Sequence, residues 1–226
     1  MHRNRWVRAL PVALAALAFF GCAHKKHARL PRPPAPAVGK SETGVASWYG
    51  HPYHGRPAAN GEIYDMETLV AAHRTLPFDT WVRVVNLSNQ KSVEVRIIDR
   101  GPFVGGRIID LSHAAAKAID LIGPGVGPVR VEVIRSPQNI PASLFAVQVG
   151  AFRVRANAES LRAQMAASYG PARLVSRPGS PDVWRVLVGA ETSEDAAAAL
   201  AGRIRQESGE KSTGFIVRID SGLAMK

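Results

Sequence analysis

An aspartate closes an alternating apolar stretch in the middle of the chain. Segment 93–97 places its valines and its isoleucine on one face of a predicted strand, and by the same alternation Asp99 follows them, just before a turn at Gly101-Pro102. A carboxyl group at the end of an apolar row is poorly hydrated and tends to hold its proton. A general acid needs that property near neutral pH, although an aspartate in this place also serves simply to pair with Arg100 or to cap the turn.

Other side chains could complete a site around such an acid. Glu62 lies in a long loop rich in glycine and proline, His73 follows an apolar run, and Trp48 and Tyr49 end an apolar segment. Taken singly, a histidine after an apolar run is more often a hydrogen-bonded interior residue, and an aromatic pair is more often part of a core. As a group with Asp99, they could form a polar site beside a proton donor.

The elements that would position these residues lie between residues 44 and 135. Short alternating stretches predict strands, separated by turn residues, and Ser112 is placed to cap a single short helix. Six or so short strands around one helix, within about ninety residues, favour a small barrel. The predicted strands are 44–50, 69–73, 81–87, 93–99, 107–111 and 129–133, and the predicted helix is 112–121.

After a short linker bounded by prolines, the pattern changes. Helical and alternating segments follow one another in the order βαββαβ, a split-βαβ unit of the ferredoxin-like or RNP-like α+β class. Two helices would cover one face of the sheet and leave the other face for binding. The predicted strands are 144–150, 173–177, 183–189 and 215–219, with helices at 156–169 and from Thr192, which is spaced from Asp195 as a capping box.

The N-terminal residues read as an export signal. Three arginines without an acid precede an apolar run, residues 9–20, that is too short to span a bilayer comfortably. Cys22, the only cysteine, excludes an intramolecular disulfide and is placed as the lipidation site of a bacterial lipoprotein. An uncleaved anchor or an ordinary signal with an incidental cysteine is the alternative. The residue after Cys22 is Ala23 and not the aspartate that signals retention in the inner membrane, which favours the outer membrane. Residues 22–42 form a proline-rich tether.

The net charge of the chain indicates which classes of partner it could bind. The chain has 29 Lys and Arg against 18 Asp and Glu, a net charge of +11. Removing residues 1–21 takes away three arginines and no acid, which leaves a net charge of +8. A basic surface outside the cytoplasm suits an anionic polymer or a membrane face. Nucleic acid would fit as well, and only the export signal argues against it. No spacing of Cys or His supports a metal site, so we expect no metal or other cofactor.

Residues 44–135 resemble the RlpA family of peptidoglycan lytic transglycosylases. The resemblance implies a double-psi β-barrel and places the family's functional residues on Glu62, His73 and Asp99. The motifs that carry it are Gly44-Val45-Ala46-Ser47-Trp48-Tyr49-Gly50, Ala59-Asn60-Gly61-Glu62, Ala71-Ala72-His73-Arg74-Thr75-Leu76-Pro77, Asp99-Arg100-Gly101-Pro102-Phe103 and Arg107-Ile108-Ile109-Asp110-Leu111-Ser112.

Residues 143–220 resemble the SPOR domain, through Val147-Gln148-Val149-Gly150-Ala151-Phe152 and Trp184-Arg185-Val186-Leu187-Val188-Gly189. The resemblance implies binding to glycan strands stripped of stem peptides at division septa. Candidate sugar contacts are Gln148, Phe152, Trp184 and Arg185, with core packing as the alternative for the two aromatic residues. An RNA-binding sheet has the same order of elements, which the export signal disfavours.

Together these patterns predict a mainly β and α+β protein with five parts. They are a lipoprotein signal peptide (1–21), a tether (22–42), a catalytic double-psi barrel (43–135), a linker (136–143) and a SPOR peptidoglycan-binding domain (144–220). We expect a monomeric periplasmic lipoprotein that is anchored through Cys22, is enriched at the septum, and contacts division proteins there.

The predicted activity is that of a lyase acting in peptidoglycan biogenesis and degradation. It would cut between N-acetylmuramic acid and N-acetylglucosamine in peptide-free strands and leave 1,6-anhydro ends. Asp99 would act first as acid and then as base, Glu62 and His73 would orient the sugar or stabilise the cation-like transition state, and Trp48 and Tyr49 would stack on a ring. The alternatives are a non-catalytic glycan-binding septal lipoprotein and a hydrolase of the same polymer.

Overall fold

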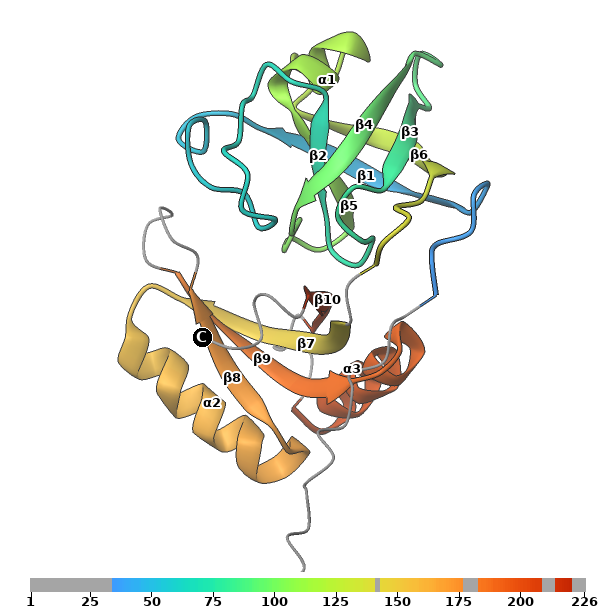
Figure 1. The fold of residues 1–226 in the computed structure, drawn as a ribbon. Coiled ribbons are helices and arrows are strands. Elements are labelled where there is room, and N and C mark those ends of the chain that lie inside the picture. The colour runs from blue at the N-terminus through green and yellow to red at the C-terminus, as the bar shows by residue number, and fades with distance from the viewer. Residues whose placement is uncertain (1–33, 141–142, 177–182, 209–213, 221–226) are drawn as a thin grey trace, which may run out of the picture.

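The computed structural model describes residues 34–140, 143–176, 183–208 and 214–220, which form a β-barrel and a four-stranded sheet carrying two helices (Figure 1). The predicted signal peptide and residues 22–33 of the predicted tether lie outside the described residues. The first strand begins at Ser41, inside the segment predicted to be tether.

The first domain is a closed six-stranded barrel, as predicted. Its strand order is β1-β5-β2-β4-β3-β6, and the β1/β5 and β2/β4 pairs are parallel, whereas the other pairs are antiparallel. Closure removes exposed sheet edges. The strands are β1 (Ser41–Tyr49), β2 (Val70–His73), β3 (Trp81–Asn86), β4 (Ser92–Asp99), β5 (Arg107–Ser112) and β6 (Val126–Arg135).

The barrel core follows from the alternation of the strands. Apolar residues at every second position point inward, because successive side chains of a strand leave on opposite faces. Those of β3, β4 and β6 form one buried cluster: Val82, Val84, Val93, Val95, Ile97, Val129, Val131 and Val133.

One extra residue changes the alternation at the end of β4. Ala71 of β2 pairs with Ile97, but Ala72 pairs with Asp99, so Ile98 is a bulge. Ile97 belongs to the barrel core, whereas Ile98 packs in a different cluster. Asp99 therefore does not continue the inward row, as its sequence position suggested, but turns towards the loop that joins β1 to β2.

The loop between β1 and β2 packs on the outside of the barrel. The Tyr64 hydroxyl donates to the carbonyl oxygen of Tyr49, and the Asn60 amide donates to the carbonyl oxygen of Ile98. Burial raises the pKa of Tyr64, which keeps the hydroxyl protonated as a donor. The cluster beneath this loop consists of Ala58, Tyr64, Val70 and Ile98, with Tyr49, Tyr53 and Met66 packed against it.

The barrel helix α1 (His113–Ala118) is shorter than predicted. Ser112 caps it as expected, since its hydroxyl oxygen accepts from the Ala115 amide. The helix does not reach residue 121 because Asp120 adopts a φ of 56°, a left-handed conformation that a right-handed helix cannot continue.

The second domain has the predicted βαββαβ order. Its elements are β7 (Ser143–Phe152), α2 (Arg155–Tyr169), β8 (Ala172–Ser176), β9 (Trp184–Glu191), α3 (Glu194–Ser208) and β10 (Phe215–Asp220), and the sheet order is β10-β7-β9-β8. Both helices pack on one face, through a cluster that includes Val147, Val149, Val186, Val188, Met165, Leu200 and Ile204. The barrel lies against the opposite face of the sheet (Figure 1).

The start of α3 differs from the prediction by one residue. Ser193, rather than Thr192, accepts from a helix amide, that of Ala196. The predicted capping box at Thr192 and Asp195 was therefore wrong, because the hydroxyl three residues before the amide is the one within reach. Among the described helices, none is both long and apolar enough to cross a membrane.

Candidate active site

Asp99 lies buried at the end of β4, with an exposed fraction of only 1%. Its Oδ1 accepts hydrogen bonds from the backbone amides of Ala59, at 3.1 Å, and Arg100, at 2.7 Å. These two amides, one from the loop and one from the strand end, fix the orientation of the carboxyl group. Asp99 lines a cavity of about 280 Å³, so its side chain is shielded from bulk water and still reachable by a ligand.

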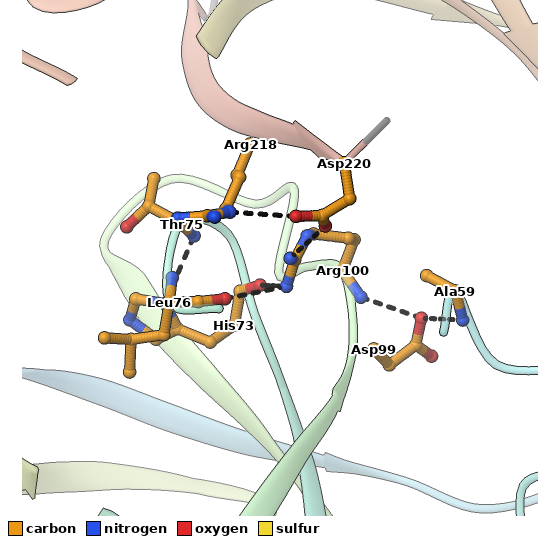
Figure 2. Close-up of polar contacts among 8 residues, drawn as sticks. All are labelled: Ala59, His73, Thr75, Leu76, Asp99, Arg100, Arg218 and Asp220. Carbon is orange, nitrogen blue, oxygen red and sulfur yellow. Dashed lines mark hydrogen bonds and ion pairs between the residues drawn. The ribbon is translucent and has the colours of Figure 1, made fainter. Parts of the chain in front are cut away.

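Arg100 joins this site to the second domain (Figure 2). Its guanidinium donates to Asp220 of β10 at 2.7 Å and to the carbonyl oxygens of His73 and Leu76. Asp220 also accepts from Arg218 at 2.9 Å. Burial lowers the pKa of Arg100 to about 10, and the charge of Asp220 opposes this shift. Arg100 is thus a buried cation at neutral pH, one residue from the candidate acid.

Glu62 lies on the loop surface, with half of its side chain exposed. Arg96 contacts both of its carboxylate oxygens, at 2.7 and 2.6 Å, and also reaches Asp79. The hydrogen bonds from Arg96 lower the pKa of Glu62 below its ordinary value. Glu62 is therefore an anion near neutral pH, which suits positioning or charge stabilisation better than proton donation.

His73 is buried at the end of β2, and both of its ring nitrogens are used within the barrel. Nδ1 accepts from the amides of Thr75 and Leu76, so Nε2 carries a proton towards Glu42, 2.6 Å away. Figure 2 shows Arg100 lying between His73 and Asp99. The ring lines a second cavity, of about 390 Å³, that does not include Asp99. The structure thus places Asp99, Glu62 and His73 in neighbouring but separate surroundings.

Asp110 is a second carboxyl group near Asp99 that the sequence did not single out. Ala72 pairs with Asp99 on one side and with Asp110 of β5 on the other, so the two acids flank one residue of β2. The Ser47 hydroxyl donates to Asp110. Burial raises the pKa of Asp110 above its ordinary value, and the charge of Asp99 acts in the same direction.

The strand pairing explains why Asp110 was missed. In the sequence it belongs to an apolar stretch followed by a helix cap, and only the neighbouring strand β2 brings it close to Asp99. Gly101 supports this arrangement, since its φ of 146° favours glycine. The signal available in the sequence was Gly101, which marks a turn two residues after Asp99.

The aromatic pair on β1 packs mainly within the barrel. Trp48 packs against the core cluster and meets the ring of His113 edge-on, at a centroid distance of 5.6 Å. Tyr49 stacks on Tyr64 at 4.3 Å. Neither residue lines the Asp99 cavity. Their predicted stacking on sugar stays a prediction, and the geometry fits the packing alternative.

The four candidates on the second domain divide between the two faces of the sheet. Gln148 and Arg185 lie on the face towards the barrel and line the Asp99 cavity. Phe152 and Trp184 pack instead against the cluster under the helices. On β9 the alternation of the strand separates Arg185 from Trp184, and on β7 the register shift between Gln148 and Gly150 separates Gln148 from Phe152. Both aromatic residues thus have the position of core anchors.

Cys22, the predicted lipidation site, lies outside the described residues. Within the described ranges, no group of three or more His, Cys, Asp and Glu side chains is arranged to hold a metal ion.

Two family models match the chain. Residues 41–131 match the lytic transglycolase model, and residues 141–218 match the SPOR domain model. The first match confirms the predicted double-psi barrel, and the second confirms the predicted SPOR domain.

Curated relatives match over both domains or over a part of the chain. The endolytic peptidoglycan transglycosylase RlpA of Campylobacter jejuni is 40% identical over 212 residues, which cover 82% of this chain and 75% of that protein. The protein of the same name from Helicobacter pylori strain 26695 is 36% identical, covering 76% of this chain and 63% of its own length. That of Pasteurella multocida is 57% identical over 99 residues, 44% of this chain and 34% of the relative.

Proposed function

The chain belongs to the RlpA family, and we propose that it is an endolytic lytic transglycosylase of peptidoglycan, a lyase that acts on strands without stem peptides at the division septum. The relatives' names support the reaction class. The observation that carries the proposal for this chain is the buried Asp99, held by two amides at a cavity.

Asp99 supplies the proton in this reaction. Its Oδ1 is held by the amides of Ala59 and Arg100, so the transferable proton is carried on Oδ2. Oδ2 protonates the glycosidic oxygen as the bond from the muramyl C1 to that oxygen breaks, and N-acetylglucosamine leaves with a hydroxyl group. The muramyl O6 then bonds to C1, and its hydroxyl proton returns to the Asp99 carboxylate. No water is consumed, because the nucleophile is already part of the substrate.

Glu62 and His73 have supporting roles in this proposal. Glu62 stays ionised through Arg96 and follows Gly61, a residue of the cavity wall, so its charge acts from beside the cavity on positive charge that develops at the sugar ring. His73 holds the β2 end through three hydrogen bonds, to Glu42, Thr75 and Leu76. It is thus a positioning residue for the strand that pairs with Asp99.

The cellular location rests on the N-terminal sequence. The basic start, the apolar run 9–20 and Cys22 support export and lipid anchoring, with the outer membrane as the destination. The SPOR domain supports placement at septal peptidoglycan, where division proteins would be neighbours.

Product analysis tests the proposal. A chain starting after Cys22 is incubated with sacculi that an amidase has or has not stripped of stem peptides, and the soluble products are weighed by mass spectrometry. We expect 1,6-anhydromuramyl ends, mostly from stripped sacculi. Reducing ends would identify a hydrolase, and bound but intact strands would identify a binding protein without activity.

The matched variants are Asp99→Asn and Asp120→Asn. Asp99→Asn removes the proton donor and keeps the acceptor for the two amides, so the chain should bind and not cut. Asp120 is an exposed aspartate of the same barrel that pairs with Lys91, and its variant should cut normally. Near-normal cleavage by Asp99→Asn would remove Asp99 from its role.

A further inference from the structure

The cavity at Asp99 has walls from both domains. The barrel contributes Pro57, Ala58, Ala59, Gly61, Asp99, Arg100 and Phe103. The sheet contributes residues of all four of its strands: Gln148, Val175, Ser176, Arg185, Leu187, Val217, Arg218 and Ile219. The candidate acid and the candidate glycan-binding face therefore meet in one space of about 280 Å³.

Direct contacts hold the two walls together. Besides the Arg100–Asp220 ion pair, the Arg218 amide donates to the carbonyl oxygen of Arg74 at 3.1 Å. The guanidinium of Arg185 lies over the ring of Phe103, 5.0 Å from its centre. These contacts join β10 and β9 of the sheet to the segment that follows Asp99 and to Arg74 at the end of β2, so the sheet is part of the folded site.

Gln148 gives the cavity an unmet hydrogen-bond acceptor. Only 4% of this residue is exposed, and its buried side-chain oxygen has no partner in the part of the chain that the structure describes. A buried acceptor without a partner costs free energy, on the order of 1–3 kcal/mol. An N–H or hydroxyl group of a sugar in the cavity would satisfy it.

The charge of the lining favours an anion. Three arginines, Arg100, Arg185 and Arg218, line the cavity, and the carboxylates of Asp99 and Asp220 lie near them. Among the lining residues that the structure describes, arginines outnumber carboxylates. A muramyl residue that has lost its stem peptide carries a free lactyl carboxylate, whereas an attached peptide turns the same group into a neutral amide. Charge-assisted hydrogen bonds to arginine distinguish these two groups.

We propose that this cavity is a single subsite for one peptide-free N-acetylmuramyl residue, bound by both domains at once. Arg185 pairs with the lactyl carboxylate, and Gln148 accepts from the sugar. The preference for peptide-free strands is thus set within the catalytic cavity by the SPOR sheet. This inference rests on the proposed function for its substrate class. The volume suits one sugar unit, since it lies just below the ~300–1,000 Å³ of typical ligand pockets.

Binding of a short ligand tests the inference independently of cleavage. The probe is N-acetylglucosaminyl-N-acetylmuramic acid without peptide, compared with the same disaccharide carrying a stem peptide. Neither contains the bond that a lytic transglycosylase cuts, so turnover does not affect the result. The isotope-labelled full chain is titrated and followed by its amide NMR signals.

We expect the amides of Ala59 on the barrel and Leu187 on the sheet to shift with one shared dissociation constant, because the disaccharide is too short for two separate sites. The peptide-free probe should bind at least tenfold more tightly than the peptide-bearing probe. Shifts confined to one domain, or equal affinities for the two probes, would overturn the inference.

Variants test whether Arg185 binds the lactyl carboxylate. Arg185→Gln should weaken the peptide-free probe by roughly tenfold or more, the value of one charge-assisted hydrogen bond, and leave the peptide-bearing probe unchanged. Arg205→Gln is the control, since Arg205 is exposed on α3, which packs on the other face of the sheet. Ser176→Asp adds a negative charge at an exposed position of the lining, and it should give the same selective loss if Arg185→Gln fails to fold.

The lytic assay separates the two proposals. Cleavage to anhydro ends with no effect of Arg185→Gln or Ser176→Asp on probe binding would refute the shared subsite and keep the proposed function. Selective binding to both domains by a chain that never cleaves would refute the activity and keep the subsite.

Discussion

Asp220→Asn should loosen the contact between the barrel and the sheet. Asp220 accepts from Arg100 of the barrel at 2.7 Å and from Arg218 of its own strand at 2.9 Å, and its side chain is 8% exposed. The asparagine keeps the size of the side chain and removes its charge. Two buried guanidinium groups then share a neutral acceptor.

The structure sets the size of the effect. Removing one partner of a buried ion pair costs about 3–5 kcal/mol. Arg100 keeps two backbone carbonyl acceptors and lies 3.7 Å from the centre of the Phe78 ring, so the lower end, about 3 kcal/mol, is the better estimate. Separation of the domains would return both guanidinium groups to water. The substitution therefore weakens the docking of the two domains and does not destabilise the barrel itself.

Amide hydrogen exchange measures this docking directly. The Arg218 amide donates to the Arg74 carbonyl oxygen across the domain boundary, so its exchange reports the opening of the contact. A loss of about 3 kcal/mol corresponds to exchange roughly 100-fold faster. Amides in the centre of β4, such as that of Val95, should keep their protection.

The matched control is Glu94→Gln, which breaks the exposed Arg83–Glu94 pair on the barrel surface. That pair should be worth less than about 1 kcal/mol, and its loss should leave the Arg218 amide unchanged. If Asp220→Asn also leaves that amide unchanged, the ion pair does not hold the domains together and the reasoning is refuted.

Three further predictions concern stability. Burial acts to raise the pKa of Glu42, but the hydrogen bond with His73 and nearby positive charges outweigh it, so the pKa lies below 4.5. Glu42 therefore stabilises the fold above its unfolded pKa and loses that effect as pH falls through the folded value; Glu42→Gln should lower Tm at pH 7 and have little effect at pH 3. The raised pKa of Asp110 has the opposite sign, so Asp110→Asn should raise Tm at pH 7 and not at pH 3, and a lower Tm at pH 7 would contradict its burial as an anion. Ser193→Ala should cost α3 roughly 0.5–2 kcal/mol in chemical denaturation, whereas Thr192→Ala should change little; equal losses would show that the cap was wrongly assigned.

Local sequence patterns predicted much of the fold. The alternation of segments such as 93–97 and 129–133 depends only on which residues are apolar, and these residues form the barrel core as predicted. The βαββαβ order of the second domain could also be predicted, because its two helices have their own apolar periodicity. Helix ends were less accurate, since one backbone conformation, that of Asp120, ended α1 early.

The candidate site could be predicted only in part. The sequence pointed to Asp99 and to Gln148 and Arg185, and the structure places all three at one cavity. It could not show that Glu62 is held by Arg96, since that contact joins a loop to a strand 34 residues away.

The sequence by itself determined the two domains, their element order and the family, because these depend on residue types at short spacings. Only the tertiary structure decided which way Asp99 faces, that Asp110 lies beside it, and that the sheet closes its cavity. A single bulge at Ile98 and an ion pair between residues 100 and 220 produce those results. Both depend on which strands become neighbours in three dimensions, and no local pattern of apolar residues encodes that.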